Sequence, residues 1–143
     1  CLTGGEPLLQ REAPELLRAL SKRRLTTVVE TGGSLDVSPI LDIDRVVLSV
    51  DVKCPGSGME SHNRWENLPM LRAADVVKFV IRDRRDYLYA RRVVRSRRLP
   101  QVVFQPVWGT DAGRLADWVL RDRLDVRTML QEHKVLWGDV PGR

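Results

Sequence analysis

Short apolar segments alternate with amphipathic segments along most of the chain. Runs rich in apolar and β-branched residues predict strands at residues 25–30, 45–50, 76–81 and 101–107, and a strand or extended segment at 126–131. Apolar residues at helical spacing predict a helix that begins near Pro14 and further helices at 67–73, 82–98 and 111–124. This alternation is typical of an α/β protein whose parallel sheet is covered by helices.

Length and composition limit the chain to one domain. It has 143 residues and a mass of 16.4 kDa, and its 43% hydrophobic and 30% charged residues exclude disordered and collagen-like classes. The chain begins without methionine, and residues 1–3 run into Gly4-Gly5 like the end of a strand. We therefore expect a single domain over residues 1–143 that is truncated at its N terminus.

No segment has the composition of a signal peptide or of a membrane span. The longest apolar run, near Val76, is interrupted by Lys78, far short of the roughly 20 residues that a span needs. Cys1 and Cys54 are too few for a disulfide framework, which favours a reducing compartment. We expect a cytoplasmic protein without a membrane partner.

The net charge of +5 comes from 24 Lys+Arg against 19 Asp+Glu, and much of it lies in residues 21–24 and 82–98. In the second segment the apolar residues at core spacing are Tyr87, Ala90, Val93 and Val94, which leaves the arginines on the solvent side. A solvated helix face is favoured over a nucleic-acid patch.

Polar and glycine residues follow the predicted strands at residues 3–6, 30–33, 49–53, 78 and 105–106. Parallel sheets bind ligands at the carboxyl ends of their strands, so these positions predict a site. Gly4-Gly5 allows close approach of the backbone to a ligand, and Glu6 offers a carboxylate to a cation such as an ammonium group. A tight turn with an acid in the first turn of a helix explains the same residues.

Glu30 ends an apolar strand, where a carboxylate needs a partner. That partner is either Lys53 or Lys78 in a salt bridge, or a ligand hydroxyl or amine. Ser49, Asp51 and Lys53 alternate and share one face, for which an outward-facing edge is the favoured interpretation.

Lys78 lies within an apolar strand, and a buried cation there suits an anionic ligand. His62 and His133 are more typical of surface or structural residues.

Five motifs occur in order along the chain: Thr-Gly-Gly-Glu-Pro-Leu-Leu-Gln at 3–10, Glu-Thr-Gly-Gly-Ser at 30–34, Ser-Val-Asp-Val-Lys-Cys-Pro-Gly-Ser-Gly-Met at 49–59, Lys-Phe-Val-Ile at 78–81 and His-Lys-Val-Leu-Trp-Gly at 133–138. Together they resemble the 7-carboxy-7-deazaguanine synthase family of radical S-adenosylmethionine (SAM) enzymes, in the queuosine and 7-deazapurine pathway. The resemblance covers essentially the whole chain, and the motifs at 53–59 and 133–138 are its most specific parts.

The resemblance implies a fold and a set of site residues. The fold is an α/β, incomplete (partial TIM-type) radical SAM barrel. The residues implied for SAM are Gly4, Gly5, Glu6, Glu30, Thr31, Ser34, Ser49 and Lys53, and those implied for the substrate are Gly5, Gln105 and His133. Gly32 stands where asparagine is common in the family.

The implied enzyme is a carbon–nitrogen lyase that uses SAM, a [4Fe-4S] cluster and Mg²⁺. A SAM-derived radical takes a hydrogen atom from 6-carboxy-5,6,7,8-tetrahydropterin, the ring contracts, ammonia leaves and 7-carboxy-7-deazaguanine forms. The implied partners are the pterin, a reducing protein such as flavodoxin or ferredoxin, and a second copy in a homodimer, with no direct nucleic acid.

The sequence departs from the family in one respect. The Cx3Cx2C loop that holds the cluster, and the threonine after it that helps bind Mg²⁺, are absent from these residues. A cluster with one iron open to SAM needs three thiolates, so we expect this polypeptide alone to bind no cluster and to lack radical activity. The alternatives are another radical SAM enzyme, or a cluster-free degenerate domain that binds nucleic acid or a partner through residues 82–98.

Overall fold

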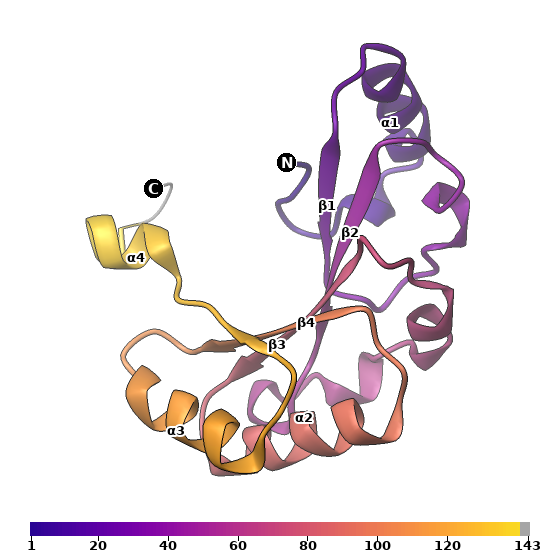
Figure 1. The fold of residues 1–143 in the computed structure, drawn as a ribbon. Coiled ribbons are helices and arrows are strands. Elements are labelled where there is room, and N and C mark those ends of the chain that lie inside the picture. The colour runs from indigo at the N-terminus through magenta and orange to yellow at the C-terminus, as the bar shows by residue number, and fades with distance from the viewer. Residues whose placement is uncertain (141–143) are drawn as a thin grey trace.

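A single open sheet of five parallel strands organises the chain, with helices on one of its faces (Figure 1). The computed structural model describes residues 1–140. The strands are β1 (Thr27–Thr31), β2 (Val46–Val52), β3 (Val76–Ile81), β4 (Gln101–Pro106) and β5 (Arg127–Thr128), and their spatial order is their chain order. Leu2 pairs in parallel with Val29 beyond β1, so the chain start lies along the free side of that strand, as expected.

The helices are α1 (Ala13–Lys22), α2 (Arg84–Ser96), α3 (Ala112–Asp122) and α4 (Glu132–Trp137). The first three cover the same face of the sheet, while α4 projects from its far end and leaves the opposite face open (Figure 1). Short 3₁₀ turns at Pro7–Leu9, Ser38–Ile40, Pro55–Ser57, Glu60–His62 and Trp65–Met70 lie in the connections.

Two apolar clusters lie between the helices and the sheet. Under α2 and α3, the Phe104 ring meets the rings of Phe79 and Tyr87 edge to face, with centroids 5.5 and 6.1 Å apart. Under α1, Leu17 packs with Ile40 and the inward side chains of β1 and β2. The strands therefore bury one face completely, and only the other face is free to bind a ligand.

Most of the predicted elements are confirmed within a few residues, and β3 has the predicted bounds. The short helix predicted at 67–73 is present with shifted bounds, as the 3₁₀ helix Trp65–Met70. Pro69 within it supplies no amide donor, which disfavours an α-helix there. β5 is limited to the two residues that pair with Val103 and Phe104. Helix α4 was not predicted. No helix within residues 1–140 combines the length and apolarity needed to cross a membrane.

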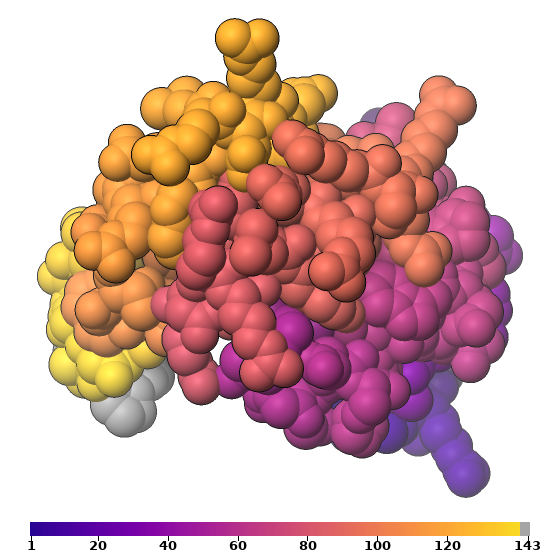
Figure 2. Space-filling view, turned by 90° about the horizontal axis from the view of Figure 1, so that it is seen from below, coloured from indigo at the N-terminus to yellow at the C-terminus, as the bar shows by residue number. Residues whose placement is uncertain are grey.

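The outer face carries the arginine-rich helix α2, seen from below in salmon beside α3 in orange (Figure 2). As predicted, Tyr87 and Ala90 are fully buried on its inner side. Several arginines are used within the chain: Arg91 pairs with Asp122 at 2.9 Å, and the Arg97 guanidinium lies over the ring of Trp65. Because these arginines are engaged within the chain, the contacts favour an ordinary solvent-facing helix over a nucleic-acid patch.

Candidate functional site

The open face of the sheet is hollowed and receives alternate side chains of the strands. On β1 and β2, Val28 and Val47 occupy it toward the amino ends, and Glu30 and Ser49 follow. On β3 and β4, polar residues and valines alternate along the strand. The hollow of about 340 Å³ is lined by Val28, Val47, Val76, Val103 and Met129, together with Glu30, Ser49, Lys78, Gln105 and Arg127. Polar residues from all five strands therefore line one hollow, interspersed with valines.

The Glu6 carboxylate joins the Gly-Gly turn to the end of β1. It accepts hydrogen bonds from the Thr31 hydroxyl at 2.9 Å and from the Gly32 N–H at 2.7 Å. It also accepts from the Leu8 N–H at 3.1 Å and so caps the 3₁₀ turn that follows. Glu6 thus ties the Gly-Gly turn to the end of β1, and most of its acceptor capacity is used within the chain.

The two glycines before Glu6 present open backbone. Gly4 and Gly5 have φ values of +94° and +52°, and a β-carbon at either would meet nothing within 4 Å. L residues rarely adopt such backbone angles, so glycine is required for the turn itself. A hollow of about 520 Å³ lies between this turn and α1.

Lys53 lies one residue beyond β2 and close to the Glu6 contact. Its Nζ donates to Asp51 Oδ2 at 2.7 Å, and a β-carbon at Gly32 would lie 3.8 Å from its Cε. The Asn63 side chain bonds both the N–H and the C=O of Lys53, at 2.8 and 2.9 Å, and holds its backbone. Strand β2 lies between β1 and β3, so the interpretation of these residues as an outward-facing edge is wrong.

Two expectations for charged residues need correction. Glu30 does not pair with Lys53 or Lys78: its carboxylate is exposed and accepts only a long bond, 3.5 Å, from the Thr3 hydroxyl, because Lys53 is held by Asp51. Lys78 is half-buried rather than buried, because the face that carries it is open.

The remaining predicted residues are spread more widely. Thr31 is buried at the Glu6 contact, whereas Ser34 is exposed in the loop after β1. Gln105 lines the 340 Å³ hollow and donates to the Leu130 carbonyl at 3.3 Å. His133 is exposed on α4, which projects from the sheet (Figure 1).

A buried asparagine that the sequence did not reveal holds the loop after β1. Asn67 is fully buried, and its amide donates to the carbonyls of Gly33 and Leu35 at 3.2 and 2.7 Å. Its oxygen accepts from the Val37 N–H at 3.4 Å. No periodicity singles this residue out, since its partners lie 30 to 34 positions earlier in the chain.

A buried aspartate does the same for the loop after β2. Asp86 accepts from the N–H of Gly56 at 2.6 Å and of Arg82 at 3.0 Å. A β-carbon at Gly56 would lie 2.5 Å from Asp86 Oδ2, so only glycine fits there. The position of Asp86 on the apolar side of the helix, next to Tyr87, was the available signal.

The two thiols lie in different environments. Cys1 is exposed, whereas Cys54 is buried, and this burial raises the pKa of the Cys54 thiol well above its usual range, with Asp86 acting in the same direction. Within residues 1–140, no three side chains of His, Cys, Asp or Glu form a group that could hold a metal ion. These residues offer a polar ligand site and no metal centre.

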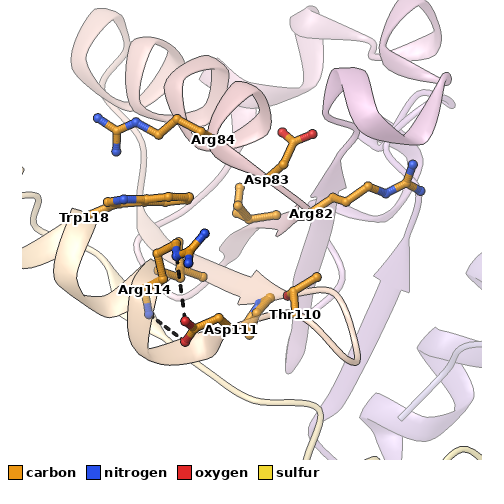
Figure 3. A pocket seen from close by; sticks show the side chains of 10 residues that line it. Arg82, Asp83, Arg84, Thr110, Asp111, Arg114 and Trp118 are labelled. Carbon is orange, nitrogen blue, oxygen red and sulfur yellow. Dashed lines mark hydrogen bonds and ion pairs between the residues drawn. The ribbon is translucent and has the colours of Figure 1, made fainter.

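A separate hollow of about 240 Å³ lies between the N-termini of α2 and α3 (Figure 3). Asp83 caps α2, Asp111 caps α3 and also approaches Arg114 at 3.8 Å, and the Arg84 guanidinium lies over the Trp118 ring. The helix N-termini are thus satisfied by the chain's own carboxylates.

Comparisons with known proteins give a consistent result. No protein-family model matches the sequence. The chain is 36% identical to the 7-carboxy-7-deazaguanine synthase of Thermoplasma acidophilum, over 99% of this chain and 68% of that protein. It is 40% identical to the synthase of Koribacter versatilis, over 95% of this chain and 67% of that protein. It is also 40% identical to the synthase of Chlorobaculum tepidum, over 96% of this chain and 64% of that protein. The chain thus spans about two thirds of the length of these relatives.

Two solved structures share the fold. Streptococcus suis SuiB superimposes with a TM-score of 0.61 at 11% identity, over 90% of this chain and 38% of that one. SuiB bound to S-adenosylmethionine gives 0.62 at 10% identity, over 90% and 36%. The likeness confirms the predicted fold class, an α/β arrangement with an open sheet of parallel strands.

Proposed function

The chain belongs to the 7-carboxy-7-deazaguanine synthase family, and on that premise we propose that it carries the SAM and substrate sites of such an enzyme. The proposed reaction converts 6-carboxy-5,6,7,8-tetrahydropterin into 7-carboxy-7-deazaguanine and ammonia. Residues 1–143 act in it as one domain. The interpretation as a nucleic-acid-binding domain is not favoured, because the relatives match nearly the whole chain.

The residues beside the Gly-Gly turn fit the chemistry of SAM. SAM offers an ammonium group, a carboxylate and ribose hydroxyls. The open carbonyls of Gly4 and Gly5 and the exposed carboxylate of Glu30 suit the ammonium group, and Lys53 suits the carboxylate. Thr31, Ser34 and Ser49 would add hydroxyl groups, and Glu6 would fix the turn on which the ligand rests.

The residues described do not fit a [4Fe-4S] cluster. Such a cluster needs three thiolates, whereas the chain has one exposed and one buried thiol. In our proposal the cluster and Mg²⁺ are therefore held by residues outside this chain. A one-electron donor such as flavodoxin or ferredoxin, and a homodimeric assembly, complete the proposed enzyme.

The hollow of the open face would hold the pterin. Its valines give a flat heterocycle an apolar surface, and Gln105 supplies a polar contact within it. In our proposal, Gly5 from the turn beyond β1 and His133 from α4 add contacts at its margins. Bound SAM supplies the group that abstracts hydrogen from the substrate. The task of these residues is to orient the substrate toward it and to exclude water.

The observation that supports this function most directly is the Glu6 contact, which joins the Gly-Gly turn to Thr31 and Gly32 beside Lys53. SAM binding to the protein, measured by isothermal titration, tests it. Glu30→Gln is expected to weaken binding about tenfold, the loss of one charge-assisted hydrogen bond.

Glu66→Gln, an exposed change outside the site, should leave the affinity unchanged. Anaerobic incubation of the protein as its gene encodes it, with iron, sulfide, SAM, a reductant and the pterin, should yield 7-carboxy-7-deazaguanine by mass spectrometry. Absence of SAM binding to the wild type would refute the proposal.

A further inference from the structure

Lys78 occupies the central strand of the sheet and faces the hollow. β3 is the third of five strands, and Lys78 is flanked on this face by Val76 and Val80 of its own strand. In the register it lies beside Asp51 of β2 and Val103 of β4. Three residues separate it from the carboxyl end of β3, about 10 Å at 3.3 Å per residue, and in the register it lies two residues nearer the carboxyl ends than Glu30 and Ser49.

The acids nearest to this lysine are already engaged or directed elsewhere. Asp51 is its direct neighbour, but the Asp51 carboxylate holds Lys53 at 2.7 Å. Glu30 accepts from Thr3 at the outer strand. Among residues 1–140, no carboxylate lies within 4.0 Å of the Lys78 ammonium group. A half-buried cation without an acid partner is uncommon on a central strand and suits an anionic ligand.

The surroundings favour a flat ligand that carries a carboxylate. Arg127 lies in the same row, on the far side of Val103, and adds a second positive charge to the hollow. Gln105 is two residues nearer the carboxyl end on the adjacent strand. The spacing between strands and the rise per residue put its backbone about 8 Å from that of Lys78. The valines beneath offer an apolar surface next to these polar groups.

We propose that the Lys78 ammonium group binds the carboxylate of the substrate within the hollow. This proposal rests on the proposed function, which gives the substrate a pterin ring with a carboxylate at carbon 6. The lysine is a binding and specificity residue: it distinguishes carboxylated from uncarboxylated pterins. A carboxylate also occurs in SAM, so the experiment must separate the two ligands.

The test compares three ligands on one protein by isothermal titration: 6-carboxypterin, unsubstituted pterin and SAM. The wild type should bind 6-carboxypterin at least tenfold more tightly than pterin. Lys78→Met, which keeps the length of the side chain, should abolish this preference and leave the affinities for pterin and SAM within threefold of wild type. Lys78→Arg should retain most of the preference.

Lys22→Met removes an exposed lysine from α1 and serves as the matched control, with all three affinities unchanged. Thermal melting of each variant shows whether it is folded. If Lys78→Met is not folded, Lys78→Gln, which also removes the positive charge, provides the test. A loss of SAM affinity with the pterin preference intact would overturn the assignment to the substrate, as would an unchanged preference in Lys78→Met. A wild type that binds SAM but neither pterin would instead refute the proposed substrate.

Discussion

Replacing Asn67 tests whether buried polar side chains hold the ligand-facing loops in place. In Asn67→Ala, the carbonyls of Gly33 and Leu35 lose the donors that now lie 3.2 and 2.7 Å away. Each unsatisfied buried group costs about 1–3 kcal/mol, and the 3.4 Å bond from Val37 adds little. The expected loss is about 3–5 kcal/mol of unfolding free energy, a large part of the 5–15 kcal/mol typical of a domain.

Urea unfolding followed by tryptophan fluorescence measures this loss, as a lower midpoint at unchanged slope. The neighbouring exposed Glu66→Ala provides the control, and a change within about 0.5 kcal/mol is expected for it. The same loop carries Ser34, so weaker SAM binding in Asn67→Ala should accompany the loss of stability. A loss below about 1 kcal/mol would show that the loop does not depend on these bonds.

Three further predictions concern buried titratable groups. Burial raises the pKa of Tyr87 to about 12, so melting temperature should fall as pH rises from 10 to 12, more steeply than in Tyr87→Phe. Burial tends to raise the pKa of Asp75, but bonds from Arg72 and backbone amides outweigh it and lower that pKa. The stability that ionised Asp75 contributes is present above about pH 4 and lost below it. Asp75→Asn should lower the unfolding free energy at pH 7 by about 3 kcal/mol or more in urea unfolding, and that free energy should fall less steeply with acidification than in the wild type. Ellman's reagent at pH 8 should react rapidly with Cys1 and with Cys54 only after denaturation, and rapid reaction of both would contradict the burial.

The parallel sheet could be predicted from the sequence because its signal is local. The apolar run at 76–81 predicts a strand with the same bounds as β3. A strand of this kind can be identified from its own residues and the turns beside it, without knowledge of its partners. The family and the fold class, predicted from motifs, are confirmed. The helix predicted at 67–73 begins two residues earlier and is a 3₁₀ helix, since Pro69 within it lacks the amide donor of a regular α-helix.

The contacts between motifs could not be predicted in the same way. Glu6 meets Thr31 across 25 positions, and Lys53 takes Asp51 as its partner, which removes Lys53 from the alternatives considered for Glu30. Such pairings depend on register and on side-chain direction, which a single sequence does not encode locally. Asn67 was missed for the same reason, since its partners are known only once the loops are folded.

The Glu6 contact also has an evolutionary consequence. The Glu6 carboxylate binds the Thr31 hydroxyl and the Gly32 amide. The residue at either position therefore limits which residues the other position can tolerate. Glu6→Gln and Thr31→Val should each be harmful, and the double variant should cost less than the sum of the two, because the second change removes a group that the first already left unpaired. Sequences of relatives should therefore change at these two positions together or not at all, and the pair would be inherited as a unit.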